Sequence, residues 1–323
     1  MTKEEEIKKK HDKIFVKTFG SPTNAKAFLK MALPEMFLEV LDLSKLRIDK
    51  TRYVDDRFKD SFTDMVFKTK MKRRSAPASG KAKEIAADIY ILFEHKSYRD
   101  EAILIQLLCY MYLMWQKDFD AKRPLRVIVP VVFYHGKAKW NIPRNFNEQF
   151  DVSDEMREFL LNYRYILFDT ADWDFRDERN AELRDNVFLL TAMALMKSAF
   201  NKDMGSIREI FKFWQEKGFT GNKEKVLFFL AYISETKDVS QGKLEKLLEE
   251  SKIDGGNIMP TLADRLREEG RREGEIRGEK RGEKRGKLET ARKLIARGVD
   301  INVIAEATGF PRKEIEKLAT PGH

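Results

Sequence analysis

Cysteine is nearly absent from the sequence, and long apolar runs are missing. Among 323 residues there is a single cysteine, Cys109, which excludes an intramolecular disulfide framework and any zinc finger built on cysteines. No apolar run approaches the ~20 residues that a membrane-spanning helix needs. The opening residues MTKEEEIKKK are charged and lack the apolar stretch of a secretory signal. We therefore exclude integral membrane and secreted disulfide-rich classes and expect a cytoplasmic protein that makes no contact with a membrane.

Charge is abundant and has a basic excess. Charged residues make up 36% of the chain, and 62 lysines and arginines against 53 acidic residues give a formal net charge of +9. Such an excess points to a polyanionic partner, although solubility alone also explains it. Hydrophobic residues, at 42%, are numerous enough for one large domain or two smaller ones with a true core.

Strand and helix patterns alternate in the first half of the chain. The run IAADIYILFE is almost continuously apolar, which is typical of a buried central strand. Pro130 lies inside a second such run and indicates a bulge or an edge position. Ser21 and Pro22 form a cap and first-turn pair that restarts a helix. The expected strands are 62–70, 85–94, 125–134 and 163–168, and the expected helices are 11–33 and 100–118.

The composition changes along the chain and divides it into four regions. We expect an α/β domain over residues 1–175, whose first ten residues fray, and a helical appendage over 176–258. A charged segment over 259–287 is either a helix or a linker, and a small helical tail covers 288–323.

Glycine recurs at every fourth position of the charged segment, which puts the glycines along one helical stripe. Each glycine costs a helix ~1 kcal/mol, whereas acid-before-base pairs return only ~0.2–0.5 kcal/mol apiece. The segment is therefore either a mobile linker or a helix that a partner stabilises against this stripe. The glycines are Gly270, Gly274, Gly278, Gly282 and Gly286.

The central strand ends in a carboxylate and an ammonium. Glu94 and Lys96 share one face of a strand, whereas His95 between them points away. Together they can support metal-assisted hydrolysis, in which the carboxylate binds a hard divalent cation and the lysine orients or activates the attacking water. A salt bridge at the strand end is the alternative interpretation.

A metal site needs a second carboxylate, and Asp64 is in the right place to supply it. If residues 62–70 and 85–94 pair as a hairpin, the midpoint between Asp64 and Glu94 is Ser79, inside the turn-like PASGK. Asp64 then lies opposite Glu94, at ~5 Å between the backbones. That distance suits one or two shared divalent ions.

The loop of this hairpin is rich in basic side chains. Lys72, Arg73 and Arg74 are our candidates for contacts with a phosphate backbone. The alternative is a solvated hairpin tip with no ligand.

A glutamine and a tyrosine follow the strand at helical spacing. Gln106 and Tyr110 are four residues apart and share one face of the expected helix. Alone this pair means little, but after Asp64, Glu94 and Lys96 it strengthens a nuclease interpretation. An acid, a β-hairpin and then Glu-x-Lys resemble the pattern of the PD-(D/E)XK nuclease superfamily.

Most of the chain also resembles the recombination-promoting nuclease (Rpn) family, which is also labelled transposase-like. The similar segments are HDKIFVKTFGSPTNAKAFLKMALP, FTDMVFKTK, YILFEHKS, PVVFYHGKAKW and the glycine-punctuated tail. The resemblance implies an α/β fold of the restriction-endonuclease type, a mixed sheet flanked by helices with a helical C-terminal region. It further implies a bacterial DNA endonuclease that depends on Mg²⁺ or Mn²⁺ and is linked to recombination or mobile elements. Its partner would be double-stranded DNA, and its location the nucleoid.

The resemblance also implies roles for individual residues. Asp64 and Glu94 take the positions of the metal-binding acids, and Lys96 takes the third catalytic position, where this family often has glutamine. Gln106 and Tyr110 match a further motif of some superfamily branches. A catalytically inactive relative that binds DNA or protein is the alternative function.

The N-terminal glutamate of the superfamily is not identified by a local motif. Glu35 and Glu39 are both candidates. His11 and Asp12 resemble the family's opening, and we interpret them as helix-start residues rather than ligands. His135 is interpreted as a turn residue.

The C-terminal segment DINVIAEATGFPRKEIEKL has the spacing of a helix-turn-helix, with Gly309 at the turn. Arg312 and Lys313, together with Lys317, are candidates for contacts with phosphates or base edges. A packing or protein-interaction role is the alternative. We also expect a homodimer formed through this C-terminal region.

Overall fold

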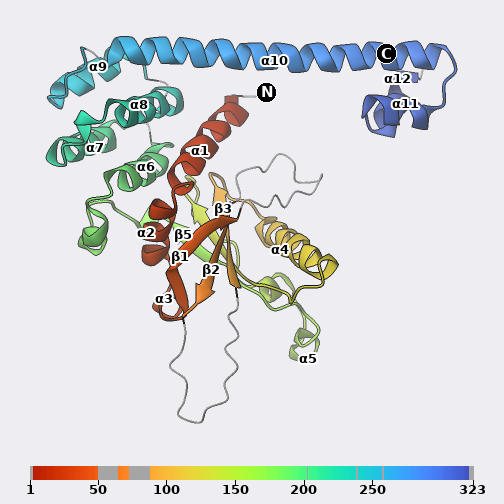
Figure 1. Ribbon diagram of the computed structural model, residues 1–323, viewed down its shortest axis with the longest axis horizontal. Coiled ribbons are helices and arrows are strands. Elements are labelled where there is room, and N and C mark those ends of the chain that lie inside the picture. The colour runs from red at the N-terminus through yellow and green to blue at the C-terminus, as the bar shows by residue number, and fades with distance from the viewer. Residues whose placement is uncertain are drawn as a thin grey trace. The chain divides into compact units, whose positions relative to one another are not determined.

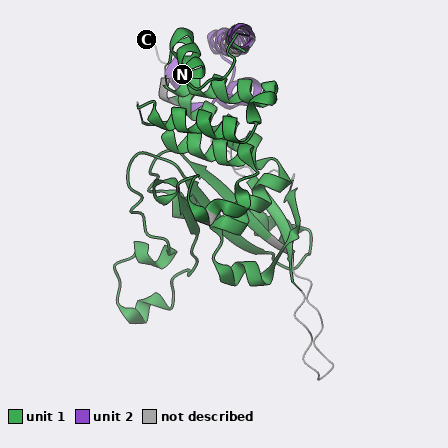
Figure 2. Cartoon of the chain, turned by 90° about the vertical axis from the view of Figure 1, so that its left-hand side faces the viewer, with its two compact units in different colours: residues 1–258 green, residues 259–323 purple. Residues whose placement is uncertain are grey.

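A computed structural model describes residues 3–49, 65–72, 88–201, 203–237, 239–256 and 258–319. The chain forms two compact units, Met1–Ile258 and Met259–His323 (Figure 2). Within the described residues, no helix combines the length and the apolar character needed to cross a membrane.

A five-stranded mixed sheet lies at the centre of the first unit (Figure 1). The strands follow the order β1-β2-β3-β4-β5; β1, β2 and β3 pair antiparallel, and β3, β4 and β5 pair parallel. This confirms the predicted mixed α/β class. The strands are β1 Leu41–Asp49, β2 Met65–Met71, β3 Asp88–Lys96, β4 Val127–Tyr134 and β5 Ile166–Asp169.

The strands β2 and β3 pair in the register expected from the sequence. The ladder runs from Met65 opposite Phe93 to Lys70 opposite Asp88. This is the register of a hairpin with its midpoint at residue 79. Asp64 itself lies outside the described residues, so its place opposite Glu94 stays a prediction.

Pro130 occupies a position in β4 where its missing N–H is tolerated. It lies beside Leu92 of β3, and pairing with β5 starts only at the next residue, Val131. At Pro130 the described part of β4 is therefore paired on one side, which agrees with the expected edge character.

Helices α1 (Lys3–Phe19) and α2 (Pro22–Ala32) cover one face of the sheet (Figure 1). The break between them falls at Ser21 and Pro22, as expected. The ring of Phe93 on β3 lies 4.9, 5.0 and 5.1 Å from the ring centroids of Phe15, Phe19 and Phe28. These aromatic contacts form the core between the sheet and the two helices.

Helix α1 begins at Lys3, so the described part of the first ten residues is helical. Two contacts with the distant helix α8 (Lys223–Lys237) hold α1. Lys10 pairs with Glu235 at 2.8 Å, and His11 Nδ1 lies 2.7 Å from the Tyr232 hydroxyl.

Helix α4 (Ile103–Asp120) covers the other face of the sheet and connects β3 with β4. Its inner side packs in a cluster with residues of β3, β4 and the segment that leads to β5. The fully buried members include Ile103, Leu107, Met114 and Val132. The sheet is thus enclosed between two helical layers.

Further helices complete the first unit, which is not divided at residue 175. His135, directly after β4, contacts the carbonyl oxygen of Met196 on α6 at 3.0 Å, so the helical region packs onto the α/β part. The longer helices of this region are α6 Val187–Ser198, α7 Gly205–Glu216, α8 and α9 Gln241–Glu250. The shorter elements are α3 Glu35–Val40, η2 Phe146–Gln149, α5 Asp154–Arg157, η3 Thr170–Asp172, η4 Glu178–Leu183 and η5 Phe219–Gly221.

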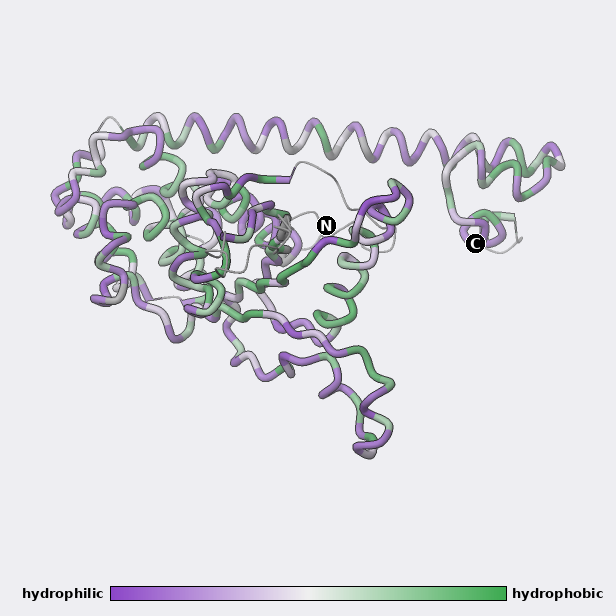
Figure 3. Tube along the Cα trace, turned by 60° about the horizontal axis from the view of Figure 1, so that its bottom comes forward, coloured by the Kyte–Doolittle hydropathy of each residue, from purple (hydrophilic) through white to green (hydrophobic). Residues whose placement is uncertain are grey.

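The regular elements of the second unit, within its described residues, are all helices. Helix α10 (Met259–Ala296) is continuous through the glycine stripe and through position 287, where we expected a boundary. It is predominantly hydrophilic along its length (Figure 3). A Cβ atom added at any of the five stripe glycines would meet nothing within 4 Å. The structure therefore shows the helical alternative rather than the linker.

Three helices meet at the end of the second unit. Ala291 of α10 packs with Ile304 of α11 (Ile301–Thr308) and Ile315 of α12 (Arg312–Ala319). Gly309, at the turn between α11 and α12, has φ +73°, a left-handed conformation that glycine adopts without steric cost. Two short helices joined by a turn at Gly309 are thus present in this region.

The aromatic core predicts a large effect of one substitution. We expect Phe93→Ala to lower the free energy of unfolding by about 3–5 kcal/mol, because Phe93 is fully buried among aromatic rings. Urea denaturation measures the change. Met36→Ala, at a side chain that is 60% exposed, is the control and should change stability by less than about 0.5 kcal/mol. Equal losses in both variants would contradict this packing.

Candidate functional site

A carboxylate and an ammonium lie buried at the carboxyl end of β3. Glu94 is 1% exposed and Lys96 is 4% exposed, and the Lys96 Nζ lies 2.9 Å from Glu94 Oε1. Both residues share the sheet face that α4 covers. Phe93 and His95 lie on the opposite face, against Phe15 of α1. Because successive side chains of a strand point to opposite faces, the end of β3 has one polar face and one aromatic face.

Helix α4 contributes two further side chains, Gln106 and Tyr110, to this polar cluster. The Gln106 side-chain oxygen accepts a hydrogen bond from Lys96 Nζ at 2.7 Å, and its Nε2 donates to Glu94 Oε1 at 3.0 Å. The same Nε2 lies 3.3 Å from the Tyr110 hydroxyl. Four of the residues predicted from the sequence, Glu94, Lys96, Gln106 and Tyr110, therefore form one hydrogen-bonded cluster.

Asp100 also belongs to this cluster. Its Oδ2 accepts a hydrogen bond from Lys96 Nζ at 2.8 Å. Its Oδ1 accepts one from the backbone N–H of Ala102, which is the residue at the N-cap position of α4. The spacing Lys96-x-x-x-Asp100 was the available signal, but in a loop this spacing has no fixed geometry.

The protonation state of Lys96 follows from these contacts. Burial lowers the pKa of Lys96, but the charges of Glu94 and Asp100 outweigh it and raise the pKa above the ordinary lysine value. Three acceptors surround the ammonium, one for each N–H. In this arrangement Lys96 is a cation at neutral pH.

The second oxygen of Glu94 has a different environment. Glu94 Oε2 is buried and has no hydrogen-bond partner among the described residues. A buried carboxylate oxygen without a hydrogen-bond partner costs free energy and is suited to a hard cation. The donor chemistry at Glu94 therefore fits a divalent metal ion. No group of three or more His, Cys, Asp or Glu residues in the described ranges is arranged as a metal site on its own.

A small cavity of about 10 Å³ adjoins the cluster. Its lining includes Glu94 and Lys96, and also Lys8 and Asp12 from α1 and Tyr98 from the loop after β3. The Tyr98 ring lies beneath two ammonium groups, at 5.3 Å from Lys8 Nζ and 5.8 Å from Lys96 Nζ. Asp12 is thus the acid that the N-terminal helix brings to this site, contrary to our interpretation of it as a helix-start residue.

The two glutamates that we considered for the N-terminal acid do not reach the site. Glu35 and Glu39 belong to α3, directly before β1. The first residue of β1, Leu41, pairs with Met71, at the opposite end of β2 from Met65. Six residues of strand separate these ends by about 20 Å.

The predicted nucleic-acid contacts are only partly described. Lys72 donates a hydrogen bond from Nζ to the Leu38 carbonyl oxygen at 2.6 Å, while Arg73 and Arg74 lie outside the described residues. Arg312 in the second unit donates to Glu316 and to Asn302, and Lys313 is exposed.

Three histidines form a buried cluster on the opposite face of the sheet. His95 Nε2 lies 2.9 Å from His135 Nε2, and His95 Nδ1 lies 3.3 Å from Asp12 Oδ1. The ring of His11 meets that of His135 edge-on at 4.8 Å. Burial holds the pKa of His135 well below its usual range. His135 is therefore a buried contact between the α/β core and α6, rather than the expected turn residue.

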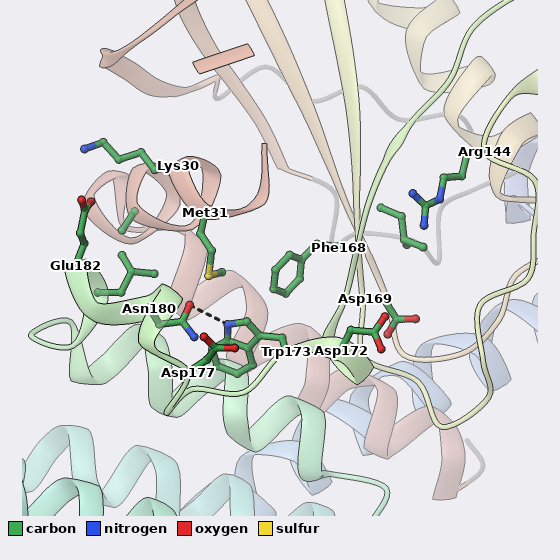
Figure 4. Close-up of a pocket in the computed structure, with 13 residues that line it drawn as sticks. Lys30, Met31, Arg144, Phe168, Asp169, Asp172, Trp173, Asp177, Asn180 and Glu182 are labelled. Carbon is green, nitrogen blue, oxygen red and sulfur yellow. Dashed lines mark hydrogen bonds between the residues drawn. The ribbon is translucent and has the colours of Figure 1, made fainter. Parts of the chain in front are cut away.

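A larger cavity of about 530 Å³ lies at the carboxyl end of β5 (Figure 4). Phe168 and Trp173 form its apolar wall, and Trp173 donates a hydrogen bond to Asn180 at 3.3 Å. Burial raises the pKa of Asp169 at this cavity. The cavity shares no lining residue with the Glu94 cluster, and it contains none of the site residues predicted from the sequence.

Together these features define a mixed α/β protein with a buried carboxylate–ammonium–amide site at the end of its central strand. Residues 9–225 match the family described as "Putative transposase, YhgA-like". The chain belongs to this family. The matched segment contains the whole sheet and the cluster around Lys96.

Three relatives show how far the similarity extends. The recombination-promoting nuclease RpnC of Escherichia coli K12 is 25% identical over 313 residues, which cover 95% of this chain and 96% of the relative. The recombination-promoting nuclease RpnD of E. coli O157:H7 is 28% identical over 128 residues, covering 39% of this chain and 45% of the relative. The inactive recombination-promoting nuclease-like protein RpnE of E. coli K12 is 23% identical over 269 residues, covering 80% and 82%. No solved structure matches the chain.

The histidine cluster predicts a loss of stability in acid. Burial, with a smaller contribution from His95, lowers the pKa of His11 from 6.5 to about 3. The unfolded chain therefore binds a proton that the folded chain rejects, so stability is complete above pH 6.5 and falls as the pH drops toward 3. We expect His11→Asn to reduce this slope by up to about 1.4 kcal/mol per pH unit.

Urea titrations at a series of pH values measure this slope. Tyr232→Phe removes the hydrogen-bond partner of His11 but keeps the histidine, so the slope should persist in this control. An unchanged slope in His11→Asn would show that His11 is not the group responsible.

Proposed function

We propose that this protein is a metal-dependent DNA endonuclease that hydrolyses phosphodiester bonds and acts in recombination or on mobile elements. The observation that carries the proposal is the buried cluster of Glu94, Lys96 and Gln106, in which one oxygen of Glu94 has no partner among the described residues. The names of RpnC and RpnD as nucleases support the same conclusion.

Asp64 and Glu94 would hold Mg²⁺ or Mn²⁺. The β2–β3 register supports this pairing, because the ladder ends with Met65 opposite Phe93 and its continuation by one residue brings Asp64 opposite Glu94. Asp12, which lines the same cavity, is a third acid within the site. The ion, when bound, supplies charge stabilisation at the phosphate and a water of lowered pKa.

Lys96 would act as a cation. Its contacts keep the ammonium protonated, so it can orient a water molecule or stabilise the negative charge that develops on the phosphate. Gln106 holds both Lys96 and Glu94 in place, which makes it a positioning residue. Tyr110 contacts Gln106 and would act through it.

The alternative function is a catalytically inactive module that binds DNA or protein. The relative RpnE, named as inactive, shows that similarity over most of the chain does not by itself imply activity. The cluster favours the enzyme, because a binding module gains nothing from a buried ammonium next to an orphaned carboxylate oxygen.

Cleavage of supercoiled plasmid tests the proposal. With Mg²⁺ or Mn²⁺ the wild-type chain should nick or linearise the plasmid, and EDTA should abolish this. We expect Asp64→Ala, Glu94→Gln and Lys96→Ala each to lower the rate by about a hundredfold or more, because each removes a charge at the reacting phosphate. Asp185→Asn and Lys212→Ala, at exposed carboxylate and ammonium groups, are matched controls that should cleave normally.

The outcomes separate the two functions. Circular dichroism spectra confirm that each variant is folded before its rate is compared. If the folded wild-type chain is inert with every metal tried but still binds DNA, the enzyme proposal fails and the binding module takes its place.

The helix-turn-helix of the second unit would add contacts with DNA. Lys313 is exposed near the start of α12, the helix that follows the turn. We expect Lys313→Ala to reduce the slope of log affinity against log salt by about one, as loss of one phosphate contact does. Lys293→Ala, at an exposed lysine of α10 that pairs with Glu289, is the control. Fluorescence anisotropy with duplex DNA measures both, and equal effects would contradict a specific role for α12.

A further inference from the structure

The cavity at the carboxyl end of β5, here termed the β5 cavity, takes no part in the proposed function. It is bordered by α2, by β5 with η3, and by η4. Its volume of about 530 Å³ lies within the roughly 300–1,000 Å³ typical of small-molecule sites. Ligands of α/β proteins commonly bind beyond the carboxyl ends of parallel strands, and β5 runs parallel to β4. The lining of the β5 cavity therefore indicates which small molecule it suits.

Two aromatic rings form a rigid wall of the β5 cavity. The Phe168 ring stacks on Phe133 of β4, at 5.7 Å between the ring centroids. Trp173 is 7% exposed, and its Nε1–H donates a hydrogen bond to Asn180 Oδ1 at 3.3 Å (Figure 4). Both rings are thus held in place before any ligand enters. Aromatic faces of this kind contact alkyl chains and attract cations, and tryptophan attracts cations most strongly.

Carboxylates outnumber basic side chains along the β5 cavity. Within the described part of the lining, four acidic residues stand beside two basic ones. This excess of negative charge repels anions such as phosphate and attracts cations. The acidic residues are Asp169, Asp172, Asp177 and Glu182, and the basic residues are Lys30 and Arg144.

The protonation equilibrium of Asp169 reflects this excess of negative charge. Burial raises the pKa of Asp169 above its ordinary value, and the nearby charge of Asp172 adds to the increase. The backbone N–H of Ala171 and the charges of Lys197 and Arg144 act in the opposite direction but do not overcome it. A ligand ammonium next to Asp169 would supply the positive charge that the lining lacks.

The carboxylates lie on two sides of the aromatic wall. In Figure 4, Glu182 lies on one side of the β5 cavity, while Asp169 and Asp172 lie together on the other. Phe168 and Trp173 lie between these two sides. A ligand that matches this arrangement has a positive charge at each end and an apolar chain in the middle.

A metal ion matches the β5 cavity less well than an organic cation. Among the residues that the structure describes, no group of three or more His, Cys, Asp or Glu side chains is placed to hold a metal. A bare ion would also leave the aromatic wall without a contact. A linear amine matches both parts of the lining, because its ammonium groups pair with carboxylates while its methylene groups cover the rings.

We propose that the β5 cavity is a binding site for a linear aliphatic diamine or polyamine. One ammonium pairs with Asp169 and Asp172, another pairs with Glu182, and the alkyl chain lies along Phe168 and Trp173. The site shares no lining residue with the small cavity at the end of β3. The proposal is therefore independent of DNA cleavage, and its test contains no DNA.

Isothermal titration calorimetry of the full chain tests the site with putrescine, cadaverine and spermidine. We expect these amines to bind as one molecule per chain, the best of them with a dissociation constant below about 1 mM. Butylamine and pentylamine keep the alkyl chains of putrescine and cadaverine but lack the second ammonium. They should bind at least about tenfold more weakly than the matching diamine, because one charge pair is lost.

Two substitutions each remove one carboxylate, from opposite sides of the site. Asp172→Asn and Glu182→Gln should each raise the dissociation constant of the best diamine by about tenfold. Both residues are exposed, so the fold should survive, and circular dichroism checks this. Asp185→Asn and Glu216→Gln, at exposed acids that do not line the cavity, are the matched controls and should bind the diamine normally.

Three results would overturn the proposal. The first is that none of the three amines binds the folded wild-type chain. The second is that the monoamines bind as tightly as the diamines, since the site would then not read two charges. The third is that the control variants lose as much affinity as the site variants, because attraction by net surface charge would then explain the binding.

Discussion

The buried ammonium of Lys96 is the constraint on which the rest of the α/β core depends. Removing an ion of this size from water costs several kcal/mol unless its hydrogen bonds are replaced. Glu94, Asp100 and Gln106 provide three acceptors within 2.9 Å. One comes from the same strand, one from the loop after it and one from α4. The acceptors that Lys96 needs therefore constrain the course of the loop after β3 and the position of α4 on the sheet.

The strand that carries Lys96 has two incompatible faces, and this explains the layers. Glu94 and Lys96 need polar partners, whereas Phe93 and His95 on the other face stack against Phe15 of α1. A one-residue slip of β3 would exchange the faces, burying Phe93 among the acceptors and the ammonium among aromatic rings. The register between β2 and β3 is thus determined by chemistry on both sides of the sheet.

Local spacing made part of this arrangement predictable. The strand parity of Glu94 and Lys96, the helical spacing of Gln106 and Tyr110 and the hairpin register all depend on residues close in sequence or on one regular period. Asp12 and Asp100 were not predicted as site residues, for different reasons. Asp12 reaches the site only because α1 packs across the sheet, and a pattern within α1 cannot show that. Asp100 sits in a loop, where no period assigns a direction to its side chain.

Local sequence patterns also could not predict that the helical region packs against the α/β core. It rests on contacts such as His11 with Tyr232 and His135 with Met196, which join residues far apart in the sequence. Each such residue looked unremarkable in its own segment. Composition separated the two regions, but composition reports how residues are distributed along the chain and not which distant side chains meet.

The site around Glu94 and Lys96 is too enclosed to admit a DNA strand as it stands. Glu94 and Lys96 are almost fully buried beside a cavity of about 10 Å³, which has room for a water molecule but not for a phosphodiester. Lys8 and Tyr98 line this cavity, and they belong to α1 and to the loop after β3. Under the proposed function these two segments must separate for DNA to enter. Glu94 would hold the divalent ion, and its Oε1 already lies 2.9 Å from Lys96 Nζ. Under the proposed function a single carboxylate would therefore hold both the ion, which supplies charge stabilisation at the phosphate, and the ammonium.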